Sequence, residues 1–497
     1  MSALQPERRP IGRNIVHIAV VVTVAFGSLA AAAGYWGVVR APELVRSPND
    51  ALVIAASRTV PRGRILDRDG KVLARNAKAR DGTIYRVYPD QSLSPVVGYA
   101  SNQYGTAGIE RSFNAQLSGL VTDPVGDALR KFGRDPYDPQ DLTLSISSSL
   151  QHAALDALGN RRGAVVMLDP TSGEVLALVS NPTYDASSIA NPDTADRAFA
   201  RLRDDPSQPL LPRATLGRYV PGSVFKIVTA VAAFGSGAID ADTSYPQQPR
   251  SEKDGLLVSG FRVRDGHHPE TGSRALDFAG ATEVSCNIYF ALTGLKTGGA
   301  NLVEYADRMG FDGPIPFDLP TAASQVSGGG GNQPGGFLDN VELANAAYGQ
   351  AKTFVTPLQM ALVAATVAND GTLMRPRLVT ATSGDQGTRA IGPAIMNRVI
   401  SAGDARTIAG AMERAVEGDL GRRFTTGARV PGVRTAGKSG TAELGGSGEP
   451  HSWFIGFAPA DQPKVAIAVV VEQGGRGAQA AAPIAGDLMA RYLRTAR

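Results

Sequence analysis

The chain contains very little cysteine and histidine for its 497 residues. A single cysteine, Cys286, excludes an internal disulfide, and the 5 histidines show no spacing typical of metal ligands. Charged residues make up 19% of the chain, form no long run of one sign and leave a net charge of only +4. Such a composition does not favour a nucleic-acid-binding surface. We therefore expect neither a metal site nor a nucleic-acid partner.

Apolar residues are abundant, at 43%, and the length favours two or more domains. Residues 14–39 contain no Asp, Glu, Lys or Arg. A run of roughly 20 apolar residues can cross a bilayer as a helix, and the preceding Arg8, Arg9 and Arg13 favour an inside N-terminus. The pattern predicts a cytoplasmic tail over 1–13, one transmembrane anchor over 14–39, and the remainder outside the membrane. A cleaved signal peptide is the alternative, although this run is longer than a typical signal core.

Beyond the anchor the pattern divides the chain into two parts. Residues 40–160 are mixed, with a turn signal at 68–71, and predict a β-rich non-catalytic module. Residues 161–497 begin with an expected hairpin over 163–180 and contain a mainly helical block from about residue 223 to about residue 415. The expected final elements are strands 434–443, 452–458 and 464–473 and a helix over 481–493. This order predicts an α/β domain with one antiparallel sheet flanked by helices on both faces.

The first motif that carries chemistry spans residues 219–226, Tyr-Val-Pro-Gly-Ser-Val-Phe-Lys. Pro221 and Gly222 interrupt the chain before an apolar helical run, so we expect Ser223 at the helix N-terminus and Lys226 one turn further on the same face. A serine hydroxyl becomes a nucleophile when a base accepts its proton, and burial among apolar neighbours lowers a lysine pKa. The alternative is a helix-capping serine followed by a surface lysine. Alone, the pattern is weak because it recurs by chance.

The second motif is Ser285-Cys286-Asn287, before an apolar helical run. Its hydroxyl and carboxamide are two residues apart, where one can relay a proton and the other can bind a substrate amide. The alternative is a polar turn that precedes a buried helix. We expect Cys286 to be a small buried residue rather than a reactive thiol.

The third motif is Lys438-Ser439-Gly440-Thr441, which fits a strand. A glycine without a side chain lets a ligand backbone approach the strand and pair with its edge. Ideal alternation places Lys438 and Gly440 on one face and Ser439 and Thr441 on the other. The alternative is an exposed edge strand with polar decoration.

Together the three motifs, S-x-x-K, S-x-N and K-[ST]-G, have the order and wide spacing of penicillin-interacting serine enzymes. The chain resembles class B penicillin-binding proteins, the D,D-transpeptidases that cross-link peptidoglycan, and especially their actinobacterial members. The similarity also covers residues 163–185, 348–376 and 451–459, and, in the non-catalytic module, 62–74 and 108–114. The resemblance implies a penicillin-binding transpeptidase fold after the anchor and a pedestal or dimerisation-like N-terminal module.

The resemblance implies acyl transfer between peptidoglycan stem peptides that end in D-Ala-D-Ala. Ser223 would attack the penultimate D-Ala carbonyl, with Lys226 as its base. Ser285, coupled to Lys438, would relay a proton to the leaving amine. An amine of a second stem peptide would accept the acyl group, and β-lactams would acylate Ser223 and remain. No metal or organic cofactor is implied, and the expected partners are the cell membrane and proteins of division or elongation.

The same resemblance assigns substrate binding to the other motif residues. Asn287 would bind the substrate amide, and the hydroxyls of Ser439 and Thr441 would bind its carboxylate beside Gly440. The backbone N–H groups of Ser223 and Thr441 would form the oxyanion hole.

Three other functions share parts of this pattern. A class A β-lactamase needs a glutamate that activates water after S-x-N, but no Glu lies between Glu304 and Glu342, and the spacing around Glu342 is wrong. A D,D-carboxypeptidase differs only in using water instead of an amine, so the residues leave it open. A catalytically idle scaffold of the division machinery would not need an activated serine.

Overall fold

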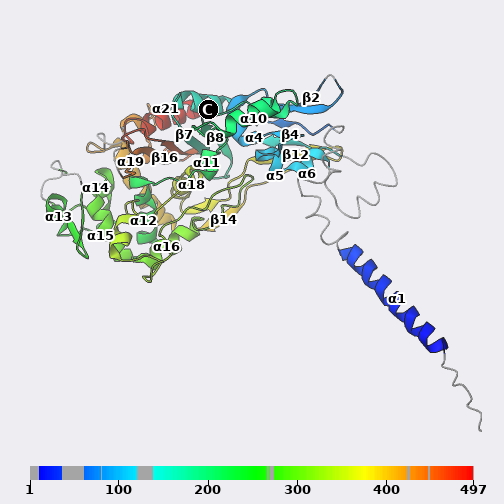
Figure 1. Ribbon diagram of the computed structural model, residues 1–497. Coiled ribbons are helices and arrows are strands. Elements are labelled where there is room, and N and C mark those ends of the chain that lie inside the picture. Colours follow the sequence, from blue (N-terminus) through cyan, green and yellow to red (C-terminus); the bar gives the residue numbers. More distant parts are fainter. Residues whose placement is uncertain are drawn as a thin grey trace, which may run out of the picture.

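The computed structural model describes most of the chain (Figure 1). The described residues are 11–35, 61–79, 81–119, 138–265, 268, 274–421, 426–445 and 448–495. Most of the expected tail and the end of the expected anchor, including Trp36, lie outside these ranges. Helix α1 (Ile11–Gly34) carries exposed apolar side chains such as Val21 and Phe26. Within the described ranges, no helix has both the length and the apolar character needed to span a bilayer.

The first part of the chain forms a mixed sheet with short helices. Its strands occur in the order β13-β12-β6-β1-β2-β3, where β1 pairs parallel with β6 and the other neighbours are antiparallel. The elements of this part are β1 (Ile65–Leu66), β2 (Val72–Lys78), β3 (Ile84–Val87), η2 (Gln91–Leu93), α4 (Ser94–Val97), β4 (Ala100–Ser101), β5 (Gly105–Thr106), α5 (Gly108–Ser112), α6 (Asn114–Ser118) and β6 (Asp141–Leu144). The turn predicted at residues 68–71 joins β1 to β2.

Two strands of this sheet come from far along the chain. Strands β12 (Val379–Gly384) and β13 (Gly387–Ala390) lie in the stretch predicted to be mainly helical, and β12 pairs with β6. That stretch also contains β9 (Leu256–Val258), β10 (Phe261–Val263), β11 (Thr372–Met374) and β14 (Ile395–Arg398). The sequence pattern did not reveal these strands within the mainly helical block because they are short and several are exposed, so they lack a clear alternation of buried residues.

The second sheet is fully antiparallel, as predicted, with the order β15-β16-β17-β7-β8. Its strands are β7 (Gly163–Leu168), β8 (Val175–Asn181), β15 (Ala436–Ala442), β16 (His451–Ala458) and β17 (Val465–Val471). Alternate residues enter two separate cores: Trp453 and Ile455 pack on one face, and Phe454 packs on the other. This period of two is what a sheet covered on both faces requires.

Helices cover both faces of this sheet (Figure 1). Helices α8 (Ser148–Leu158) and α21 (Ala481–Thr495) pack on the Phe454 face, and α18 (Pro357–Ala368) packs on the other. The remaining elements are α9 (Ala186–Ala190), α10 (Ala195–Arg203), α11 (Arg213–Leu216), η3 (Gly222–Phe225), α12 (Lys226–Gly235), α13 (Gln248–Asp254), α14 (Phe278–Glu283), α15 (Asn287–Thr297), α16 (Gly299–Arg308), α17 (Asn340–Ala346), α19 (Ala402–Glu417) and η5 (Thr426–Ala428). Strand β15 is at the edge of the sheet, beside η3 and α19.

Candidate active site

Ser223 lies in the 3-10 turn η3, which continues directly into helix α12. The segment that leads to this turn is held by its backbone: Tyr219 exchanges two hydrogen bonds of 2.9 Å with Val355. Val220 O accepts a hydrogen bond from Trp453 Nε1 at 3.0 Å. Ser223 is partly exposed, and within the described residues its Oγ has no hydrogen-bond partner. The hydroxyl is therefore available to an incoming group.

Glycines bring strand β15 against this turn. Gly222 has a φ of +57°, and a Cβ there would lie 2.6 Å from Thr441 O. A Cβ at Gly440 would lie 3.0 Å from Pro221 O and 3.1 Å from Val224 N. Residues with a side chain cannot be accommodated at such separations without a shift of the backbone. The nucleophile's turn and the outer edge of β15 are thus in direct backbone contact.

Lys226 is fully buried at the start of α12 and binds the second motif. Its Nζ donates to Ser285 O at 2.6 Å, to Asn287 Oδ1 at 2.7 Å and to Ser285 Oγ at 3.2 Å. Ser285 has a φ of +61°, a left-handed conformation that is uncommon for a residue other than glycine. This turn between α14 and α15 presents both polar side chains of the motif to the lysine.

Lys438 reaches the same hydroxyl from strand β15. Its Nζ donates to Ser285 Oγ at 2.8 Å and to Ser439 O at 3.0 Å. Ser285 Oγ is therefore within hydrogen-bonding distance of two lysines, Lys226 and Lys438, which are 0% and 1% exposed. The three motifs, which are far apart along the chain, meet at this oxygen.

Burial controls the charge of both lysines. It lowers the pKa of Lys226 to about 8, although the negative charge of Asp265 opposes this change. Burial lowers the pKa of Lys438 well below its usual value, and the nearby charge of Lys226 lowers it further. Because desolvation and a like charge both disfavour an ammonium ion, a neutral amine is accessible here near neutral pH. An amine in that state can accept a proton from a serine.

The side chains of the third motif divide between two directions. Lys438 and Gly440 face the first two motifs, as strand alternation predicts. Ser439 is 8% exposed, whereas Thr441 is exposed and its Oγ1 accepts a hydrogen bond from Gly477 N at 3.3 Å. The structure therefore gathers six of the eight predicted residues around Ser285 and the nucleophile's turn, whereas no hydrogen bond among the described residues joins the hydroxyl of Ser439 or Thr441 to the first two motifs.

Sequence reasoning did not identify the neighbours that hold this arrangement. Gly349 O accepts a hydrogen bond from Gly222 N at 2.9 Å, and a Cβ at Gly349 would lie 2.0 Å from Gly222 O. Gly477 makes a similarly close approach to the other side of β15, since a Cβ at Gly477 would lie 2.4 Å from Gly440 O. Gly349 could have been singled out because it belongs to the Tyr-Gly-Gln segment that resembles the family. The resemblance alone does not show which residues this glycine contacts.

Comparisons with known proteins cover both parts of the chain. Residues 163–490 match the penicillin binding protein transpeptidase domain, and residues 62–131 match the penicillin binding protein A dimerisation domain. The chain is 36% identical to the peptidoglycan D,D-transpeptidase PbpA of Mycolicibacterium smegmatis, over 97% of this chain and 99% of that protein. It is 35% identical to PbpA of Mycobacterium tuberculosis, over 88% of this chain and 90% of that protein.

The fold also resembles solved structures. The ceftriaxone acyl-enzyme complex of penicillin-binding protein A from M. tuberculosis has a TM-score of 0.76 and 32% identity, and covers 88% of this chain and 98% of that one. The imipenem acyl-enzyme complex of the same protein has a TM-score of 0.75, with 88% and 99% covered. The motifs that meet at Ser285, the domain matches and these similarities agree, so this chain belongs to the penicillin-binding protein transpeptidase family, as a member of the penicillin-binding protein A type.

Proposed function

We propose that the chain is a peptidoglycan D,D-transpeptidase that forms an acyl-enzyme on Ser223 and is acylated there by β-lactams. The observation that carries this proposal is that Lys226 and Lys438 both donate a hydrogen bond to Ser285 Oγ. This oxygen lies beside the turn that carries Ser223. Relatives bear the name peptidoglycan D,D-transpeptidase, and two of the similar structures are β-lactam acyl-enzyme complexes.

In the acylation step, the Ser223 oxygen attacks the carbonyl carbon of the penultimate D-Ala while Lys226 accepts the hydroxyl proton. The tetrahedral intermediate then collapses, and the bond to the terminal D-Ala nitrogen breaks. Ser285 Oγ gives its proton to that nitrogen and regains one from an adjacent lysine, since both lysine Nζ atoms lie within 3.2 Å of it. In the second half-reaction an acceptor amine attacks the ester, and the same groups return its proton to Ser223.

Substrate binding follows from the edge position of β15. We propose that the donor peptide lies along this edge, beside the nucleophile's turn, and that Asn287 meets its amide. The backbone N–H groups of Ser223 and Thr441 serve as the oxyanion hole. The hydroxyls of Ser439 and Thr441 bind the terminal carboxylate, which requires Thr441 to exchange its contact with Gly477.

The surroundings of Glu342 disfavour a class A β-lactamase. Its two carboxylate oxygens accept hydrogen bonds from Gly328 N at 2.9 Å and Leu338 N at 2.7 Å, and the residue is buried. A carboxylate that holds a loop in this way is not placed to activate water at Ser223. We therefore expect a β-lactam ester on Ser223 to persist.

The choice between transpeptidase and carboxypeptidase depends on the acceptor. A donor peptide that ends in D-Ala-D-Ala, incubated with the full chain and a D-amino acid acceptor, should yield the amide of the acceptor by mass spectrometry. Because an amine is intrinsically more nucleophilic than water, we expect aminolysis to exceed hydrolysis. Hydrolysed donor as the sole product at every acceptor concentration would identify a carboxypeptidase instead.

We further propose that residues 14–39 anchor the protein in the cell membrane, with the catalytic part outside and 40–160 as a non-catalytic module that positions it among division or elongation proteins. The support is the stretch of 26 residues without Asp, Glu, Lys or Arg and the exposed apolar side chains of α1. The full chain should sediment with membranes and need detergent for release, whereas a chain lacking residues 1–39 should not. Release by high salt alone, or a mature N-terminus beyond residue 30, would contradict a retained anchor.

A further inference from the structure

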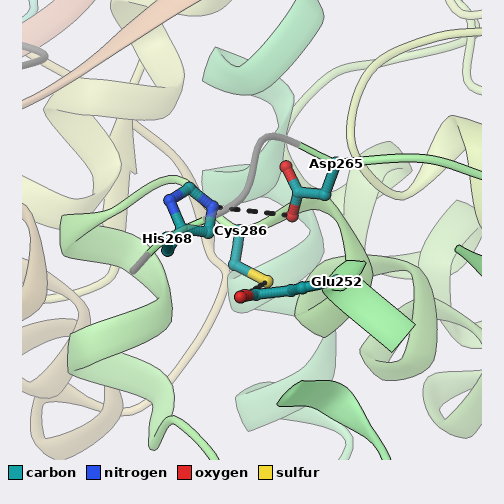
Figure 2. A group of neighbouring side chains, drawn as sticks. All are labelled: Glu252, Asp265, His268 and Cys286. Atoms are coloured by element: carbon teal, nitrogen blue, oxygen red, sulfur yellow. Dashed lines mark hydrogen bonds and ion pairs between the residues drawn. The ribbon is translucent and has the colours of Figure 1, made fainter. Parts of the chain in front are cut away.

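Four potential metal-binding side chains meet directly behind the second motif (Figure 2). They are Glu252 from α13, Asp265 and His268 from the segment after β10, and Cys286 at the start of α15. One donor atom from each lies within 4.8 Å of every other. In Figure 2 the carboxyl group of Glu252 lies beside the Cys286 sulfur, and Asp265 is paired with His268.

These donors are buried and rich in negative charge. Glu252, His268 and Cys286 are at most 7% exposed, and the Asp265 side chain is 4% exposed. Cys286 Sγ donates to Glu252 Oε1 at 2.9 Å, and His268 Nε2 lies 3.7 Å from Asp265 Oδ2. Two carboxylates close together in a low-dielectric interior are costly unless a cation compensates them. The nearby Lys226 ammonium interacts electrostatically with Asp265, but its hydrogen bonds go to Ser285 and Asn287.

The donor set indicates which cation fits. A thiolate, an imidazole and carboxylates are ligands of Zn²⁺ and similar divalent transition ions, whereas Mg²⁺ and Ca²⁺ prefer oxygen alone. Zinc–ligand bonds of about 2.0–2.3 Å in a tetrahedron place the ligand atoms roughly 3.3–3.8 Å apart. The observed spacing, within 4.8 Å, therefore needs only a small contraction.

Neighbouring groups orient these donors as the outer contacts of metal sites do. The backbone N–H groups of Asn287 and Ile288 donate to Asp265 Oδ2 at 2.5 and 3.2 Å. Gln248 Nε2 donates to Glu252 Oε1, and Gln248 Oε1 accepts a hydrogen bond from Leu276 N at 2.9 Å. The cluster is thus built into the fold rather than formed by flexible surface groups.

We propose that Glu252, Asp265, His268 and Cys286 bind one divalent transition-metal ion of the Zn²⁺ class, which fixes the Ser285–Asn287 turn. Binding releases one proton, that of the Cys286 thiol, and the thiolate sulfur takes its place as a ligand. No electron is transferred. Cys286 lies between the two residues that bind Lys226, and Ser285 holds its left-handed φ of +61°, so the metal clamps the strained turn to α13 and to the segment after β10.

The test uses the purified full chain, incubated with Zn²⁺ or Co²⁺, dialysed, and analysed for metal content. We expect about one ion per chain, and for Co²⁺ a thiolate-to-metal absorption band together with the intense visible bands of a tetrahedral site. Cys286→Ser should abolish the thiolate band, and His268→Gln should reduce the retained metal at least about tenfold. The matched variants His152→Gln and Glu304→Gln, at residues that pair with Asp90 and Arg308 and do not belong to the cluster, should bind as the parent does.

The parent chain alone can overturn the proposal, whether or not the variants fold. Retention of less than about a tenth of an ion per chain, or retained Co²⁺ without a thiolate-to-metal band, would show that the four side chains are held by hydrogen bonds alone. The clamping role has its own readout: removal of the ion should slow acylation of Ser223 by fluorescent penicillin by about tenfold to a hundredfold. An unchanged rate would remove that role while leaving the metal site. Metal content does not depend on catalysis, so its outcome is independent of the proposed transpeptidation.

Discussion

Ser223→Ala is expected to abolish covalent labelling of the protein by fluorescent penicillin. The substitution removes the only atom proposed to form the ester, and loss of a serine nucleophile typically costs about 10⁴-fold or more. The fold should be preserved, because Ser223 Oγ has no hydrogen-bond partner within the described residues. We expect the free energy of unfolding to change by less than about 1 kcal/mol. Denaturing electrophoresis after incubation with the label measures the effect directly.

Helix α12, which follows the turn that carries Ser223, provides a control for this experiment. Ser236, at the other end of α12, donates its hydroxyl proton to Ala232 O at 2.7 Å and does not approach the three motifs. Ser236→Ala should label at the parent rate. If Ser223→Ala retains labelling, the assigned nucleophile is wrong, and if the parent loses its label within seconds, the enzyme hydrolyses β-lactams.

The second large effect concerns Lys226 and pH. Burial lowers the pKa of Lys226 to about 8, so the neutral amine that accepts the serine proton becomes the major form only above that pH. The acylation rate should therefore rise about tenfold from pH 7 to pH 9 and then level off. Asp265 and Cys286 oppose this shift, because they favour the ammonium form of Lys226. A rate independent of pH between 6 and 9 would assign the base elsewhere.

Lys226→Arg separates the charge of this residue from its basicity. A guanidinium stays protonated throughout this pH range, so it keeps a cation in place but cannot accept the proton. We expect the acylation rate to fall by about 10²–10⁴-fold and the pH dependence to disappear. Lys296→Arg, at an exposed position of α15, should behave as the parent. Parent-like acylation by the Lys226 variant would mean that the buried lysine is structural.

Local features of this protein were predictable from the sequence, whereas contacts between distant segments were not. The hairpin of β7 and β8, the final strands and the start of the helix after Ser223 follow from turn residues and from the period of apolar side chains. The pairing of β12 with β6 depends on an edge that exists only in the folded protein.

The site shows the same division. The relation of Ser223 to Lys226 is local, since both belong to one helical turn and its continuation. The contact of Ser285 Oγ with Lys438 joins residues 153 positions apart, and only the family resemblance suggested it. The cluster of Glu252, Asp265, His268 and Cys286 was missed because its donors come from three separate segments, and only Asp265 and His268 are close together in the sequence.

The glycine contacts around the nucleophile limit how such an enzyme can escape an antibiotic. At Gly222, Gly349 and Gly440, any side chain would press on the backbone of a neighbouring segment, at 2.6, 2.0 and 3.0 Å. Substitutions that reduce drug binding at these positions would also displace the reactive serine and so end cell-wall synthesis by this enzyme. Selection for drug resistance should therefore leave these three glycines unchanged.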